Sequence, residues 1–130
     1  MRLLLDTHIA IWLMTLDERL RRPARRLIAS SDNQIFVSAV SLWEIAIKHA
    51  LGRGDDAMPM PAWIAHRDFL AVGMTIVPVT AEHAVEVERL PSVHGDPFDR
   101  LLVAQAVAEP FRLVTHDKRL SAYGETVIVV

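Results

Sequence analysis

Short apolar runs alternate with amphipathic segments along the chain. Five of these runs have the length and the aliphatic or β-branched character of buried strands, at 3–5, 34–38, 74–79, 111–115 and 127–130. The segments between them predict helices at 7–14, within 17–30, and at 39–51, 61–72, 80–90, 97–108 and 117–123. Strands that alternate with helices in this way predict an α/β fold, with a mostly parallel sheet and helices on both faces.

Residues that begin and end helices support several of these boundaries. Pro23 fits a helix start better than a helix interior, so a short turn precedes the helix within 17–30. Gly52 ends the preceding helix, and Thr80 is a good N-cap for the helix that follows it. The stretch 52–61, GRGDDAMPMP, has the composition of a surface loop. We therefore expect residues 1–130 to form one domain.

Composition narrows the class of protein. The chain has 130 residues, 52% of them hydrophobic, which is enough for a core without disulfides or a structural metal. The absence of cysteine from the sequence excludes thiolate zinc sites and a cysteine nucleophile. Asp6 and His8 interrupt the apolar N-terminal run, and no cleavage site follows it, so we expect a cytoplasmic protein. A net charge of −2 argues against a passive polycation, but not against an enzyme that touches nucleic acid locally.

Four carboxylates fall on one edge of the predicted sheet. Asp6 and Asp117 follow strands, and Asp99 lies in the first turn of a helix. Glu44 lies about two turns into the helix that follows the second strand, in an otherwise apolar segment. In open parallel sheets, ligands bind outside the carboxyl ends of the strands. We therefore expect these four side chains to converge there.

Each of these acids also has a purely structural interpretation. Asp6 and Asp117 could cap the helices that follow them, and Glu44 could pair with Lys48 at the i,i+4 spacing. Asp99 could serve as the acid of a capping-box-like helix start. Taken singly, these alternatives stay open.

Taken together, the four acids point to a cation. Converging carboxylates repel one another and raise one another's pKa values unless a positive charge intervenes. Mg²⁺ and Mn²⁺ prefer oxygen ligands, and such ions can activate a water for in-line displacement at phosphorus. Zinc is disfavoured, because the sequence offers neither cysteine nor a histidine pair at i,i+4.

Four segments in order resemble the PIN-domain ribonucleases, and more closely the VapC-type toxins of bacterial type II toxin–antitoxin systems. They are LLLDTH, SAVSLWEIAIK, DPFDRLLVAQA and LVTHD. The resemblance implies a PIN-like α/β/α sandwich on a five-stranded sheet. The positions that match its four-acid centre, which would hold one or two Mg²⁺ or Mn²⁺ ions, are Asp6, Glu44, Asp99 and Asp117. Asp96 and Thr115 match supporting positions.

The same resemblance implies an activity and partners. The reaction would be hydrolysis of an RNA phosphodiester by a metal-activated water, without a covalent enzyme intermediate, leaving a 5′-phosphate and a 3′-hydroxyl. The chain would form a homodimer. A cognate VapB-type antitoxin would lay a segment, often with an arginine, across the acidic site. A PIN nuclease of RNA processing that is not a toxin stays open as an alternative.

Two other phosphate-handling folds fit less well. A haloacid-dehalogenase-type phosphatase needs a second acid two residues after Asp6, where this chain has His8. A phospho-acceptor receiver domain, which would be a signalling module, needs an aspartate after the third strand and gives Glu44 no role. The sequence lacks Walker A and GxGxxG motifs, which disfavours a nucleotide cofactor.

Basic residues are the candidates for contact with RNA. Arg22, Arg25 and Arg26 lie opposite the apolar face of their predicted helix, where the alternative is a solvated surface. Arg100 and Lys118 each adjoin one of the proposed acids. Outside the four acids, 14 basic residues face 12 acidic ones, so the rest of the chain has a slight positive excess. Its overall charge is therefore compatible with a nuclease.

Overall fold

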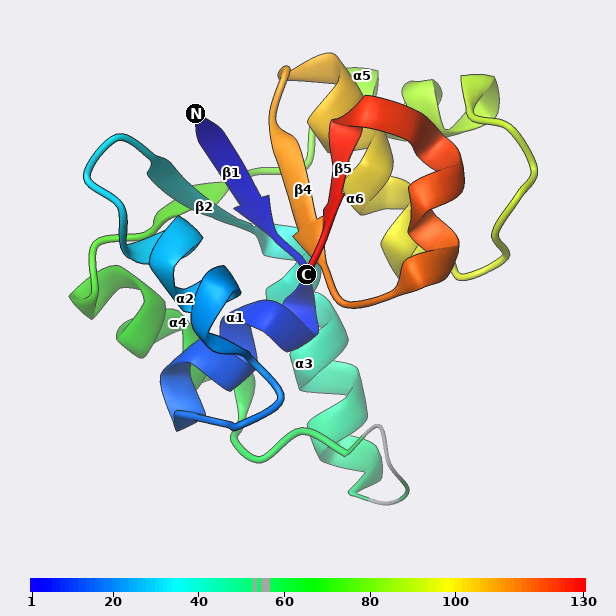
Figure 1. The fold of residues 1–130 in the computed structure, drawn as a ribbon. Coiled ribbons are helices and arrows are strands. Elements are labelled where there is room, and N and C mark those ends of the chain that lie inside the picture. The colour runs from blue at the N-terminus through cyan, green and yellow to red at the C-terminus, as the bar shows by residue number, and fades with distance from the viewer. Residues whose placement is uncertain (53, 55–56) are drawn as a thin grey trace.

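The computed structural model describes residues 1–52, 54 and 57–130, and contains a five-stranded, all-parallel sheet (Figure 1). The strand order is β3-β2-β1-β4-β5. The strands are β1 (Arg2–Leu5), β2 (Gln34–Ser38), β3 (Thr75–Val77), β4 (Arg112–Thr115) and β5 (Val127–Val129). The predicted α/β class is confirmed. The third strand is shorter than predicted, and it ends just before Pro78, which has no N–H for a strand ladder.

Helices occupy the segments between the strands. They are α1 (Thr7–Thr15), α2 (Arg22–Ala29), α3 (Ala39–Leu51), α4 (Ala62–Ala71), α5 (Ala81–Glu86) and α6 (Pro97–Ala108), with the 3₁₀ segments η1 (Val87–Arg89) and η2 (Lys118–Thr126). Thr80 caps α5 as predicted, since its hydroxyl accepts a hydrogen bond from the His83 N–H. The single helix predicted at 80–90 is divided between α5 and η1, and the helix predicted from residue 117 is the 3₁₀ segment η2.

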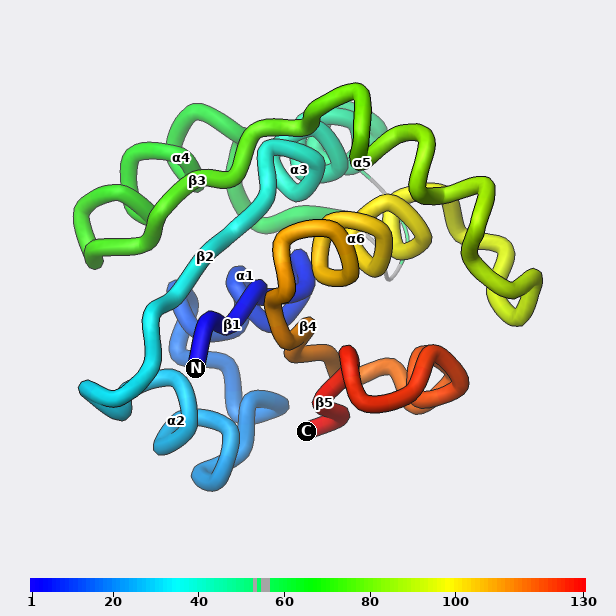
Figure 2. The backbone as a smooth tube through the Cα atoms, turned by 90° about the horizontal axis from the view of Figure 1, so that it is seen from above, coloured from blue at the N-terminus to red at the C-terminus, as the bar shows by residue number. Residues whose placement is uncertain are grey.

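The sheet has an apolar layer on each face, and β1 shows how the sequence builds both. Leu3 and Leu5 pack into one core cluster with residues of α1, α2 and α4, whereas Leu4 packs on the other face with residues of α6 and η2. All three leucines are fully buried. A continuous apolar run is what a strand covered on both sides requires. Figure 2 shows α2 and α6 on opposite sides of β1.

The strand order reverses between β1 and β4. The chain moves from β1 through β2 to β3 in one direction, and then returns to add β4 on the other side of β1. In such sheets, the point where the order reverses is where ligands bind. Strands β1 and β4 are hydrogen-bonded neighbours at this point, and the Asp6 N–H donates to the Val114 carbonyl at 2.9 Å.

Gly52 ends α3 as predicted, at a φ of 63°, and its N–H bonds the Lys48 carbonyl. Part of the predicted loop 52–61 lies outside the described residues. Among the helices that the structure describes, none combines the length and the apolar character needed to cross a membrane.

Candidate metal centre

An acidic pocket of about 370 Å³ opens at the carboxyl edge of the sheet, and the acids singled out from the sequence meet in it. The carboxylates that line the pocket are Asp6, Glu44, Asp96, Asp99 and Asp117. They come from the end of β1, from α3, from the start of α6 and from the turn after β4. The strand order thus brings together residues that are far apart in the sequence.

Asp6 is buried, and Thr115 holds its carboxylate. Its side chain is 6% exposed and makes no capping hydrogen bond to α1, so the capping interpretation fails. Instead, the buried Thr115 hydroxyl donates a 2.6 Å hydrogen bond to the Asp6 carboxylate. Burial raises the pKa of Asp6, and the charge of Glu44 raises it further, while the bond from Thr115 opposes both effects.

Glu44 is the most deeply buried of these acids, with 3% of its surface exposed. The predicted pair with Lys48 is present, with the ammonium nitrogen 2.6 Å from Oε2. The other oxygen, Oε1, is buried and has no hydrogen-bond partner within the described part of the chain. A buried carboxylate oxygen left unsatisfied costs free energy, and a bound cation would satisfy it.

Asp99 is half-buried and lies against His94. Its Oδ2 is 2.8 Å from His94 Nε2, and the His94 side chain is 4% exposed. Burial, together with the charge of Asp6, raises the pKa of Asp99 to about 7, although the bond to His94 opposes the shift. Asp96 is the N-cap of α6 and accepts a hydrogen bond from the Asp99 N–H at 3.0 Å. Asp96 therefore fixes the turn that carries Asp99.

Asp117 is paired with Arg119 at the rim of the pocket. The guanidinium contacts both carboxylate oxygens, with Nε 3.0 Å from Oδ1 and Nη2 2.8 Å from Oδ2. This pairing lowers the pKa of Asp117. The Asp117 N–H also donates to the Thr115 hydroxyl at 3.1 Å, so one threonine braces two of the acids.

The donors in this pocket fit a hard divalent cation. Ligand atoms of His94, Asp99 and Asp117 lie within 4.8 Å of one another, and Glu44, whose Oε1 is unsatisfied within the described residues, lines the pocket with both of these aspartates. Carboxylate oxygens are the ligands that Mg²⁺ and Mn²⁺ prefer. No role for His94 is predicted from the sequence, and the signal available there is its position five residues before Asp99 in HGDPFD.

The basic residues named from the sequence lie in different settings. Arg25 donates to the backbone carbonyls of Leu20 and Asp17, and Arg100 donates to four oxygens, three of them backbone carbonyls. Both guanidinium groups therefore have a structural role. Arg26 and Lys118 are exposed and line neither the acidic pocket nor the groove beside it, in which Arg22 lies.

Comparison with known proteins places this architecture in a family. The model of the PIN domain matches residues 3–125. Over 121 residues, the chain is 36% identical to Ribonuclease VapC22 of Mycobacterium tuberculosis, covering 92% of this chain and 90% of that protein.

Solved structures share the fold at lower sequence identity. VapBC2 from Rickettsia felis, solved bound to a promoter DNA fragment, matches with a TM-score of 0.72 at 17% identity, over 100% of this chain and 98% of that one. VapC20 of Mycobacterium tuberculosis, described as a toxin that cleaves the sarcin-ricin loop, matches with a TM-score of 0.66 at 20% identity, over 95% of both chains. The resemblance drawn from the four sequence segments is confirmed: the chain belongs to the PIN domain family, and is related within it to the VapC ribonucleases.

Proposed function

We propose that this protein is an Mg²⁺- or Mn²⁺-dependent endoribonuclease and the toxin of a VapBC-type pair, acting in the cytoplasm. The observation that carries the proposal is the meeting of Asp6, Glu44, Asp99 and Asp117 in one pocket, where a buried Glu44 oxygen has no partner among the described residues. The relative at 36% identity is named a ribonuclease, and PIN domain proteins generally depend on divalent metal.

The four acids would hold one or two ions. When bound, a divalent cation supplies positive charge that activates a water and stabilises the charge that develops at phosphorus. Thr115 and His94 fix the orientations of Asp6 and Asp99, which preorganises the ligand set. Lys48 and Arg119 line the same pocket and place positive charge where an RNA phosphate would enter. We expect products with a 5′-phosphate and a 3′-hydroxyl.

The proposed partners are RNA, a VapB-type antitoxin and a second copy of the chain. Structures that share the fold include toxin–antitoxin complexes from Klebsiella pneumoniae and Haemophilus influenzae. The open acidic pocket suits an arginine from an inhibiting segment. The homodimer is supported by Trp43, Ile47 and Leu51, which repeat every four residues on α3 and are 59%, 37% and 60% exposed.

The decisive experiment compares wild type with Asp99→Asn on a pool of total RNA, with Mg²⁺ or Mn²⁺ and with EDTA. We expect divalent-dependent cleavage by the wild type and a loss of at least about 100-fold in the variant, because the substitution removes one of the pocket's charges. Asp68→Asn, at an acid on α4, is the matched control and should cleave normally. Equal cleavage by Asp99→Asn and wild type would overturn the site assignment.

A further inference from the structure

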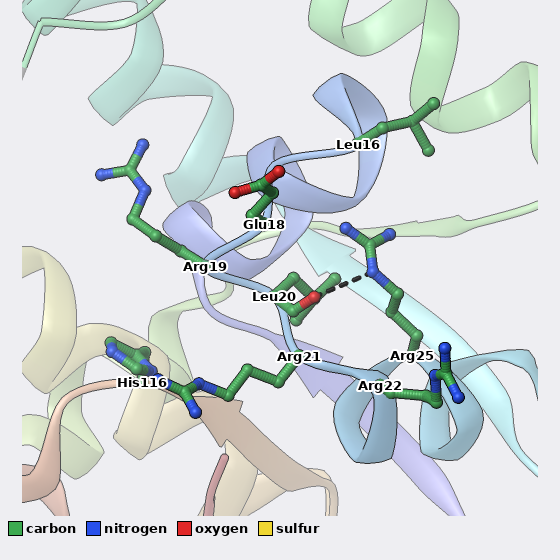
Figure 3. Close-up of a pocket in the computed structure, with 8 residues that line it drawn as sticks. All are labelled: Leu16, Glu18, Arg19, Leu20, Arg21, Arg22, Arg25 and His116. Atoms are coloured by element: carbon green, nitrogen blue, oxygen red, sulfur yellow. Dashed lines mark hydrogen bonds between the residues drawn. The ribbon is translucent and has the colours of Figure 1, made fainter.

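A second groove, of about 730 Å³, adjoins the acidic pocket and is lined mainly by basic side chains (Figure 3). We call it the arginine groove. Its charged lining residues are Glu18, Arg19, Arg21, Arg22 and Arg25, joined by His116. The lining holds four arginines and one glutamate, and one of these arginines, Arg19, is paired with Asp17, so the groove keeps a net positive charge, opposite in sign to that of the pocket beside it.

The arginine groove and the acidic pocket are continuous. Arg19 and His116 line both of them. A ligand that leaves the carboxylates in this direction therefore passes these two side chains first. If one phosphate of a polyanion is held at the metal centre, a neighbouring phosphate on this side would lie near the basic side chains of the arginine groove.

The side chains at this junction are held in place before any ligand arrives. Both Asp17 oxygens bind the Arg19 guanidinium, with Nε 3.0 Å from Oδ1 and Nη2 2.8 Å from Oδ2. The same guanidinium lies over the Trp12 ring, 4.7 Å from its centroid, yet the side chain is 63% exposed. The His116 ring packs edge-on against the Trp12 ring, with 5.1 Å between the ring centroids. The rotamer entropy that a phosphate contact normally costs is therefore largely lost already on folding.

The connection between α1 and α2 carries the other arginines. Arg25 donates to the carbonyls of Leu20 and Asp17 at 2.8 and 2.7 Å, which fixes the backbone of this connection. Arg21 and Arg22 are exposed, and Figure 3 shows Arg21 extending towards His116 while Arg22 turns to the other side. Arg25 thus supports the groove, Arg19 is paired with Asp17, and Arg21 and Arg22 offer charge to a ligand.

We propose that the arginine groove binds the RNA strand next to the cleaved bond, through its phosphates. This inference rests on the proposed function and extends it, since it gives the path of the RNA away from the metal centre. Guanidinium groups suit phosphate oxygens, and contacts to phosphates bind without regard to base sequence. Binding through the groove should therefore depend on salt and on RNA length, and not on sequence.

The test measures binding of a fluorescein-labelled oligouridylate by anisotropy over a range of salt concentrations. All proteins carry Asp99→Asn and are studied in EDTA, so that the probe stays intact. We expect Arg21→Ala/Arg22→Ala to bind the probe about 10-fold more weakly. The slope of log K against log salt concentration should fall in magnitude by about 1.4, because each single-strand phosphate contact contributes about 0.7 to it. Arg21→Lys/Arg22→Lys should retain most of the affinity because it keeps the charge.

The control variant, Arg67→Ala/Arg112→Ala, removes the same charge from two exposed arginines outside the groove and should bind as the parent does. Unchanged binding and salt slope in Arg21→Ala/Arg22→Ala would overturn the inference. So would equal competition by poly-glutamate of matched charge, which would indicate a site for an acidic protein. Cleavage of total RNA by the wild type, measured in parallel, separates these outcomes from a failure of the proposed function.

Discussion

Thr115 donates a 2.6 Å hydrogen bond to the carboxylate of Asp6 across 109 residues of sequence. Both side chains are buried, at the carboxyl ends of neighbouring strands. The bond holds the negative charge of Asp6 in a fixed direction, and the same hydroxyl accepts from the Asp117 N–H. A single threonine thus links the acid after β1 to the acid after β4.

Replacing this threonine by valine should weaken the centre while preserving its shape. In Thr115→Val we expect Mn²⁺ affinity, measured by titration calorimetry, to fall about 10-fold, because a partner that orients a ligand is lost. The free energy of unfolding should fall by about 1–2 kcal/mol, since buried Asp6 loses a donor. Thr115→Ser keeps the hydroxyl and should retain the Mn²⁺ affinity of the wild type. Wild-type Mn²⁺ affinity in Thr115→Val would show that the bond does not position Asp6.

Asp99 should make the metal-free protein sensitive to pH. Its pKa is raised to about 7 from an ordinary value of 3.8, so the folded state keeps a proton that the unfolded state releases. The free energy of unfolding in EDTA should therefore fall as the pH rises from about 4 to 7, by on the order of 2 kcal/mol. Urea unfolding at several pH values measures this decline. Asp99→Asn should remove most of it, and a wild type whose stability rises over this range would contradict the prediction.

His94 should act through the orientation of Asp99. With the imidazole removed in His94→Ala, we expect RNA cleavage and Mn²⁺ affinity to fall together by about 10- to 100-fold. His66→Ala, at an exposed histidine on α4, is the matched control. Circular dichroism should show an unchanged fold in both variants. Full Mn²⁺ affinity in His94→Ala would show that Asp99 needs no such support.

Arg119 competes with a cation for Asp117. Because its guanidinium covers both carboxylate oxygens, we expect Arg119→Ala to bind Mn²⁺ a few-fold more tightly in the absence of RNA. The pKa of Asp117, which Arg119 lowers, should rise towards its ordinary value, and NMR titration can follow it. Weaker Mn²⁺ binding in Arg119→Ala would mean that the arginine supports the ligand set rather than competing for it.

Leu16 offers a test of backbone strain away from the acids. It ends α1 in the left-handed region at a φ of 54°, and it is 76% exposed. Leu16→Gly should raise the free energy of unfolding by about 0.5–1 kcal/mol, because glycine adopts this conformation without steric cost. Gly52→Ala, at a φ of 63° after α3, should lower it by a similar amount. Urea unfolding of both variants measures whether the free energy of unfolding rises in Leu16→Gly and falls in Gly52→Ala.

The sequence was sufficient for the fold class, because a strand buried on both faces must be a continuous apolar run, as 3–5 is. It was insufficient for the strand order, which depends on pairing between distant segments. The convergence of Asp6, Glu44, Asp99 and Asp117 could be predicted because carboxyl ends of parallel strands share one edge.

The partners of these acids were harder to predict. His94 and Arg119 lie close to Asp99 and Asp117 in the sequence, but this proximity does not by itself reveal the hydrogen bonds that they form. Arg25 makes contacts that the helical pattern does not predict. Its position opposite the apolar face suggested contact with solvent and RNA, but its long side chain reaches back to two backbone carbonyls. Helical spacing gives the direction of a Cα–Cβ bond, and not where a flexible guanidinium ends.

The strand order β3-β2-β1-β4-β5 also has a consequence for biosynthesis. The first strand of the chain, β1, lies in the middle of the sheet, and its neighbour β4 is made only after β2 and β3. A nascent chain that has not yet reached Thr115 and Asp117 lacks two of the side chains that complete the acidic pocket. On the proposed function, the nuclease therefore becomes active only after β4 and the turn that follows it have been made, and a ribosome that synthesises this protein is not exposed to its product before then.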